Sequence, residues 1–182
     1  MRLIWYTAMS MDGRIAGAGD DMSFLETIDS VGEPDDAWPE FIASIDAVVI
    51  GGSTLRWLVD GGHGWPHGDL PTWLVSRDAQ LRARVGDVER PIHQREGDLG
   101  AVLDEIAADG HERVWLCGGG DIAGQALALD RVDEVIVTIA PTALGAGPSL
   151  FDAFCLEQRR FELDEVRRYG SQSARLVWHR AR

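Results

Sequence analysis

The feature that most constrains this chain is a short, continuous apolar run that ends in small residues and recurs along the sequence. Ala47–Ile50 is followed by Gly51 and Gly52, and residues 72–76 and 113–117 repeat the pattern. Such uninterrupted runs are typical of strands that are buried on both faces of a sheet. The sequence therefore predicts an α/β protein.

Further segments extend this sheet and provide its helical cover. Residues 2–9 and 135–140 predict two more strands, and residues 38–45 carry apolar side chains at roughly helical spacing. Residues 98–108 show the same spacing and predict an amphipathic helix. Strands that alternate with helices imply a mainly parallel sheet.

The C-terminal stretch follows a different pattern. Residues 161–169 and 174–179 flank the turn-forming segment 170–173, which predicts an antiparallel hairpin. A chain of 182 residues with 45% hydrophobic residues is long enough for one buried core. We therefore predict a single domain over residues 1–182, with a three-layer αβα fold and a central mixed, mainly parallel sheet.

Composition excludes several classes of function. All 17 basic residues are arginine, which excludes lysine Schiff-base chemistry and the P-loop lysine. A formal net charge of −13 would repel a phosphate backbone, so nucleic acid is not expected as a partner. No apolar segment approaches the roughly 20 residues of a membrane span.

The cysteines and histidines give no sign of a disulfide framework or a metal site. Cys117 and Cys155 lie far apart in the sequence, which suits a reducing compartment, and we expect a cytoplasmic protein with no membrane contact. His63 and His67 are separated by glycine and proline, which excludes a regular helix that would align them as ligands. No metal is therefore predicted.

Turns rich in small residues follow three of the predicted strands, at residues 51–54, 76–77 and 118–121. In a parallel sheet they would lie along the carboxyl edge, where open α/β sheets bind ligands. Glycine lets the backbone approach a pyrophosphate closely, and a helix that begins near Asp121 would point its positive end at the same place. Each turn alone is equally typical of a tight connection, so the prediction depends on the three together.

Arg77 directly follows one of these strands. Its guanidinium could pair with the 2′-phosphate that distinguishes NADP from NAD. Taken alone, it is as well explained as a solvated surface arginine.

Five segments form a recognisable set: residues 9–16 (MSMDGRIA), 51–54 (GGST), 74–77 (LVSR), 118–122 (GGGDI) and 140–151 (APTALGAGPSLF). Taken together, they resemble the dihydrofolate reductase-like superfamily that includes the reductase domain of bacterial riboflavin biosynthesis proteins. They occur in the family's order and span essentially the whole chain. The resemblance identifies the superfamily and leaves the substrate open.

The resemblance implies NADPH bound across the carboxyl edge of the sheet, and often a homodimer. Ala8 and Ile15 match positions that frame the nicotinamide. The residues matched to the adenosine-side phosphates are Ser53, Thr54, Ser76 and Arg77, and Gly51 and Leu55 beside them are also expected to bind the cofactor. The residues matched to the pyrophosphate loop are Gly118, Gly119, Gly120, Asp121 and Ile122.

The chain departs from the family at two charged positions. The riboflavin-pathway reductases usually carry a lysine in the first strand and a glutamate before the glycine run, where this sequence has Tyr6 and Cys117. Both changes remove a charge, which argues against the ribosylaminopyrimidine of that pathway as the substrate. Reduction of a C=N bond also needs a proton donor, and Asp35 and Asp36 are the candidate catalytic acids. They are equally well explained as acids at the start of the helix over 38–45.

The sequence thus favours an NADPH-dependent reductase of a small heterocyclic substrate, pterin-like or pyrimidine-like. Two alternatives stay open. One is a non-catalytic protein that binds a nucleotide or small ligand on the same fold. The other is a 5-amino-6-(5-phosphoribosylamino)uracil reductase of riboflavin biosynthesis.

Overall fold

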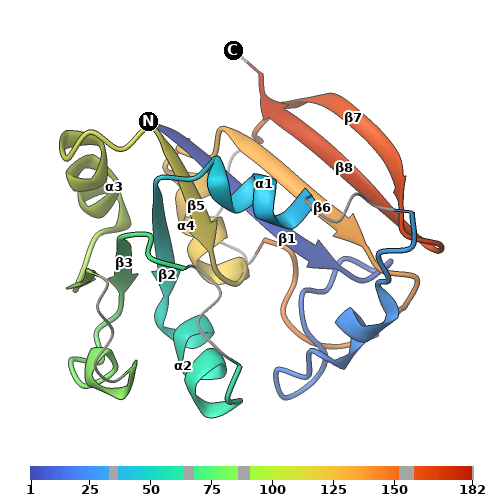
Figure 1. The fold of residues 1–182 in the computed structure, drawn as a ribbon, viewed down its shortest axis with the longest axis horizontal. Coiled ribbons are helices and arrows are strands. Elements are labelled where there is room, and N and C mark those ends of the chain that lie inside the picture. Colours follow the sequence, from blue (N-terminus) through green and yellow to red (C-terminus); the bar gives the residue numbers. More distant parts are fainter. Residues whose placement is uncertain (33–36, 64–67, 86–90, 152–157, 182) are drawn as a thin grey trace.

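The computed structural model describes residues 1–32, 37–63, 68–85, 91–151 and 158–181. These residues form one eight-stranded sheet with the order β4-β3-β2-β5-β1-β6-β8-β7 (Figure 1). The strands are β1 (Arg2–Met9), β2 (Ala47–Gly51), β3 (Thr72–Val75), β4 (Ile92–Arg95), β5 (Arg113–Cys117), β6 (Glu134–Ile139), β7 (Phe161–Tyr169) and β8 (Ser173–Arg180). The helices are α1 (Ala37–Ala43), α2 (Gly52–Asp60), α3 (Leu99–Ala108) and α4 (Gly120–Ala128), and two 3-10 helices are η1 (Ser23–Thr27) and η2 (Arg82–Val85).

The strand directions confirm the predicted mixed sheet. Every neighbouring pair from β4 to β6 is parallel, whereas β8 is antiparallel to both β6 and β7. Strand β1 lies between β5 and β6, so the first segment of the chain occupies the middle of the sheet. Its last residue, Met9, pairs with Ile139.

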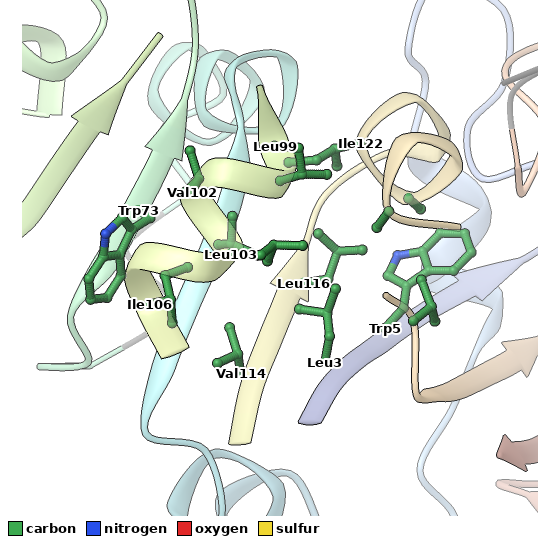
Figure 2. Close-up of a cluster of buried hydrophobic side chains, with 14 of the residues drawn as sticks. Leu3, Trp5, Trp73, Leu99, Val102, Leu103, Ile106, Val114, Leu116 and Ile122 are labelled. Carbon is green, nitrogen blue, oxygen red and sulfur yellow. The ribbon is translucent and has the colours of Figure 1, made fainter. Parts of the chain in front are cut away.

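Both faces of the sheet are covered, as the continuous apolar runs predicted. Successive side chains of a strand point to opposite faces. Leu3 and Trp5 of β1 belong to a buried cluster with α3 and α4, and Figure 2 shows the side chains of α3 lying against β5. Ile4 belongs to a second buried cluster with residues of α2, and Tyr6 and partly buried residues of α1 pack against it. This arrangement is the predicted three-layer αβα fold.

The sequence pattern missed the edge strand β4. Its four residues, Ile-His-Gln-Arg, contain a single apolar side chain, and all of them are only half-buried. An edge strand has a neighbour on one side only and does not need the continuous apolar run of a central strand. Within the described residues, no helix is long and apolar enough to cross a membrane.

Candidate functional site

The three turns predicted to bind an anion lie next to one another at one edge of the sheet. Gly51 of β2 pairs with Val75 of β3, and Ile50 pairs with Cys117 of β5, so these three strands end at the same level. The turns that follow them are therefore neighbours in space as well as equivalent in sequence. This is the carboxyl edge at which open α/β sheets bind ligands.

Close approaches between the turns fix their order along this edge. A Cβ atom placed on Gly52 would lie 2.8 Å from Oγ of Ser76, and one placed on Gly118 would lie 3.8 Å from Oγ1 of Thr54. The turn at 51–54 is thus packed between Ser76 on one side and Gly118 on the other. At Gly52 only the absence of a side chain allows the contact.

Helices α2 and α4 both begin at this edge, and no side chain of the described residues caps either start. Their N-cap residues are Gly51 and Gly119, neither of which can offer a capping side chain. The first N–H groups of a helix have no partner within the helix, and they favour an anion. Asp121, in the first turn of α4, accepts a hydrogen bond from Nε2 of Gln125 at 3.1 Å. The two helix starts thus present uncapped donors on neighbouring turns.

Two residues that the resemblance placed at the cofactor have buried side chains. Leu55 is fully buried beneath α2, and Ile122 is buried beneath the turns, where a Cβ on Gly51 would lie 3.6 Å from Ile122 Cγ2. Their side chains support the turns from below, so only their backbone could contact a ligand. Ser53 is exposed and Thr54 is half-buried, so both hydroxyls lie within reach of one.

Arg77 is exposed immediately beyond β3. It forms no hydrogen bond or ion pair with any described residue, whereas nearby Arg56 of α2 pairs with Asp78 at 3.7 Å. Ser76 accepts a hydrogen bond from the backbone N–H of Asp78 at 3.1 Å, which leaves its own hydroxyl proton to donate. The side chains of Ser76 and Arg77 are therefore available to a ligand at this edge.

A cavity of about 380 Å³ lies beside the edge, on the face of the sheet covered by α1. Ala8 and Ile15, which the resemblance matched to the nicotinamide, both line it. A Cβ on Gly119 would lie 3.7 Å from Cδ1 of Ile15, so this side chain adjoins the glycine turn as well as the cavity. The other described residues that line the cavity are Tyr6, Thr7, Met22, Leu25, Ile28, Trp38, Trp115, Thr138, Tyr169 and Arg175.

Aromatic rings form one wall of this cavity. Trp38 of α1 lies edge-on to Trp115 of β5, with 5.4 Å between ring centroids, and edge-on to Tyr6 of β1 at 5.6 Å. Rings in this arrangement present flat apolar surface with a few polar atoms at the margin. The wall suits a small planar ligand.

Arg175 of β8 brings a positive charge to the same cavity. Its side chain is buried, its Nη2 donates a hydrogen bond to the hydroxyl of Tyr6, and its Cζ lies 3.9 Å from the centroid of the Tyr169 ring. Sequence reasoning missed Arg175, because an arginine in an alternating strand is usually solvent-facing. Another part of the cavity wall does have a sequence signal. Met22, Leu25 and Ile28 recur at every third position, which indicates a short 3-10 segment with one apolar face.

Asp12, which follows the first strand, has a structural task. Its carboxylate accepts hydrogen bonds from the backbone N–H groups of Leu144 at 3.0 Å and Gly145 at 2.7 Å, and from the Ser10 hydroxyl at 2.5 Å. These donors, led by Ser10, hold the pKa of Asp12 well below its usual range. The carboxylate thereby joins the loop after β1 to the loop after β6.

The same two loops meet again at Gly147. This glycine has φ +115°, and a Cβ there would lie 2.1 Å from the carbonyl oxygen of Ala16. Arg14 donates to the Gly147 carbonyl at 2.9 Å, and Ile15 donates its N–H to Pro148 at 3.1 Å. These contacts hold Ile15 in position at the cavity.

The candidate acids Asp35 and Asp36 lie outside the described residues, immediately before α1 begins at residue 37. Cys117, at the end of β5, is buried, and burial raises the pKa of its thiol to about 12. A thiol with this pKa stays protonated at neutral pH and does not act as a nucleophile. Cys117 is therefore a packing residue.

Comparison with known proteins agrees with this geometry. Residues 47–174 match the model of the RibD C-terminal domain family. The chain is 25% identical to the uncharacterized protein YwjB of Bacillus subtilis, over 99% of this chain and 98% of that protein.

Two solved structures share the fold along the whole chain. A protein of Shewanella sp. PV-4, whose name assigns it provisionally to riboflavin biosynthesis, superposes with a TM-score of 0.85 at 22% identity, over 100% of both chains. A pyrimidine reductase-like protein of Corynebacterium diphtheriae gives a TM-score of 0.70 at 18% identity, over 100% of this chain and 92% of that one.

The family match covers well over half of the chain, and it includes the turns at 51–54, 76–77 and 118–121. This protein belongs to the RibD C-terminal domain family, whose fold is dihydrofolate reductase-like. The resemblance stated from the sequence motifs is confirmed.

Proposed function

We propose that this protein is an NADPH-dependent reductase of a small planar heterocycle, pyrimidine-like or pterin-like. The observation that carries the proposal is the position of Ile15, which adjoins both the glycine turn at Gly119 and the aromatic cavity. An elongated cofactor that followed the edge would place one end in that cavity. The substrate would occupy the remaining space against Trp38, Trp115 and Tyr6.

The residues along the edge fit NADPH. The uncapped starts of α2 and α4 would take the phosphates, with hydroxyl donors from Ser53 and Thr54. Arg77, which has no described partner, would pair with the 2′-phosphate. When bound, NADPH would supply the hydride. Ala8 and Ile15 would position the reactive ring and keep water from it.

Proton donation is the second requirement of the reaction. We propose Asp35 or Asp36 as the acid, because they directly precede α1, which contributes Trp38 to the cavity. The described residues that line the cavity include no carboxylate, so the acid must come from outside this lining set. The variants Asp35→Asn and Asp36→Asn test this assignment. The variant that removes the acid should reduce turnover about 10²-fold or more, and NADPH affinity should be unchanged in both variants.

A compound screen distinguishes the reductase from the alternative of a non-catalytic binding protein. A panel of pyrimidines and pterins is screened for oxidation of NADPH by its absorbance, and NADPH binding is titrated in parallel by protein fluorescence. Binding together with substrate-dependent oxidation supports the reductase. Tight NADPH binding without oxidation across the whole panel supports a nucleotide-binding protein. Absence of NADPH binding contradicts the reductase and leaves only a protein that binds another small ligand.

The residue at position 117 argues against the riboflavin-pathway reductase. Cys117, where that enzyme usually has a glutamate, is a buried neutral thiol. It offers no charge to a polar substrate. The ribosylaminopyrimidine of that pathway therefore belongs in the panel as the compound expected to fail.

A further inference from the structure

Arg175 is a buried cation whose charge no described carboxylate balances. It is 7% exposed, and its described hydrogen-bond partners are the neutral hydroxyls of Tyr6 and Thr138, the second at 3.4 Å from Nε. Its Nη1 forms no hydrogen bond to any described residue. By contrast, Arg180 on the same strand pairs with Asp133 at 2.7 Å. Carboxylates are abundant in a chain of net charge −13, so their absence around Arg175 in the described residues is a specific feature.

An unbalanced buried cation costs free energy. A guanidinium removed from water without a counter-ion loses hydration that neutral hydroxyls only partly replace. The cavity walls beside it are aromatic, aliphatic or hydroxyl-bearing. A negatively charged ligand in the cavity would offset this cost.

The strand register places Arg175 in line with Ala8 at the wall of the cavity. In the sheet, Ala8 pairs with Thr138, and Thr138 pairs with Arg175, so the three form one row across β1, β6 and β8. All three line the cavity. The Tyr169 ring covers a face of the guanidinium, so a ligand meets it in its own plane, where two N–H groups can bind two oxygens.

We propose that Arg175 determines substrate specificity by binding an oxyanion of the substrate, most simply a carboxylate carried by the planar heterocycle. The oxyanion would lie two strands away from Ala8, and the heterocycle would span the distance between them. This inference rests on the proposed function only for its assignment of the cavity to the substrate. It predicts that anionic heterocycles are preferred over neutral ones of the same shape.

The test uses a matched pair of probes, uracil-6-carboxylate and uracil, titrated calorimetrically into the full-length protein with and without NADPH. Wild-type protein is expected to prefer the carboxylate by at least about tenfold, the scale of a charge-assisted hydrogen bond. Arg175→Met should remove the preference while leaving uracil affinity unchanged, and Arg175→Lys should retain part of it. Arg168→Met, which removes an exposed arginine of the same hairpin, is the control and should keep the wild-type preference.

The other outcomes are equally decisive. Inorganic phosphate is titrated as a third probe, and Arg175-dependent binding of phosphate in place of the carboxylate would support the oxyanion site and identify a phosphate ester as its source. Failure of wild-type protein to bind either anion at millimolar concentration would overturn the proposal. An equal loss of affinity for uracil and its carboxylate in Arg175→Met, with a lowered Tm, would assign Arg175 a structural role instead.

NADPH titration of the same variants separates this inference from the proposed function. Unchanged NADPH affinity in Arg175→Met is expected, and a selective fall in NADPH affinity would place the cation at the cofactor and overturn the inference. If wild-type protein binds the carboxylate but not NADPH, the proposed function fails and the oxyanion site stands.

Discussion

The side chain of Ile15 lies against Gly119, with its Cδ1 atom 3.7 Å from the point that a Cβ on the glycine would occupy. Gly119 has φ −76°, a value that any residue adopts. A side chain at this position therefore meets no backbone strain and no severe clash within the protein. The glycine is needed only if something else must approach the backbone there.

This relationship makes Gly119→Val a selective test of the cofactor edge. We expect NADPH binding to be lost because the new side chain would fill the space for the pyrophosphate, while the fold is retained at a cost of about 1 kcal/mol for a poorer N-cap. Gly118→Ala is the contrasting variant, since its Cβ would lie 2.5 Å from Ile122 Cγ2 and should lower stability. Fluorescence titration with NADPH and thermal unfolding by circular dichroism distinguish the two. Wild-type affinity in folded Gly119→Val would mean that the glycines only form a turn.

Arg77 is predicted to set the preference for NADPH over NADH. Arg77→Ala should reduce the ratio of the two affinities about tenfold or more, because a charge-assisted contact to the 2′-phosphate is lost while NADH affinity is unchanged. Arg56→Ala, which removes a neighbouring exposed arginine paired with Asp78, is the matched control. Equal dissociation constants for the two cofactors in the wild-type protein would remove Arg77 from the site.

Asp12 is predicted to make stability depend on acid pH. Its folded-state pKa lies below the usual value of 3.8, so the contribution of this carboxylate is fully present above that value and is lost as the pH falls toward the folded-state pKa. Asp12→Asn should lower Tm at neutral pH. As the pH is lowered below about 4, Tm should decrease less steeply in this variant than in the wild-type protein. Asp104→Asn, at an exposed carboxylate paired with Arg131, should leave both almost unchanged. Parallel Tm curves for wild-type and Asp12→Asn protein down to pH 2 would contradict the assigned role.

A homodimer is predicted from the family resemblance, and the C-terminal hairpin is the surface we expect to form it. Strand β7 is an edge of the sheet, and its Leu163 and Val166 are 57% and 59% exposed. Apolar side chains on an open edge favour pairing with another chain. Light scattering of wild-type protein should give the mass of a dimer, and the double variant Leu163→Glu, Val166→Glu should give that of a monomer. Val31→Glu, at an exposed valine elsewhere, should stay dimeric, and a monomeric wild type at micromolar concentration would exclude the interface.

The neighbouring turns at the carboxyl edge of the sheet could be predicted from the sequence because their signals are local. A buried parallel strand needs an uninterrupted apolar run, and its end is marked by the glycines that follow, as at Ile50 and Gly51. The strand register then aligns such ends without further information. Ala8 and Ile15 both line the cavity, and their assignment to the nicotinamide, which comes from the motif resemblance, stays a prediction.

The cavity could not be predicted in the same way, because the residues that line it come from segments that meet only in the folded chain. Arg175 reaches Tyr6 although 169 positions separate the two. In residues 173–178, the apolar and β-branched or aromatic side chains indicate a strand and do not reveal which face borders a cavity. The edge strand β4 was missed for a related reason, since half-buried polar residues carry no apolar pattern.

The order of strands in the sheet separates the turns at the carboxyl edge from the C-terminal residues of the cavity. The turns of the cofactor edge follow β3, β2 and β5, whereas Arg175 and Tyr169 come from the hairpin that is added to the far side of β6. Under the proposed function, mutations in this hairpin would change which compound is accepted and leave nucleotide binding intact. Relatives with this strand order could then differ in substrate through the C-terminal hairpin while they share one mode of binding the reductant.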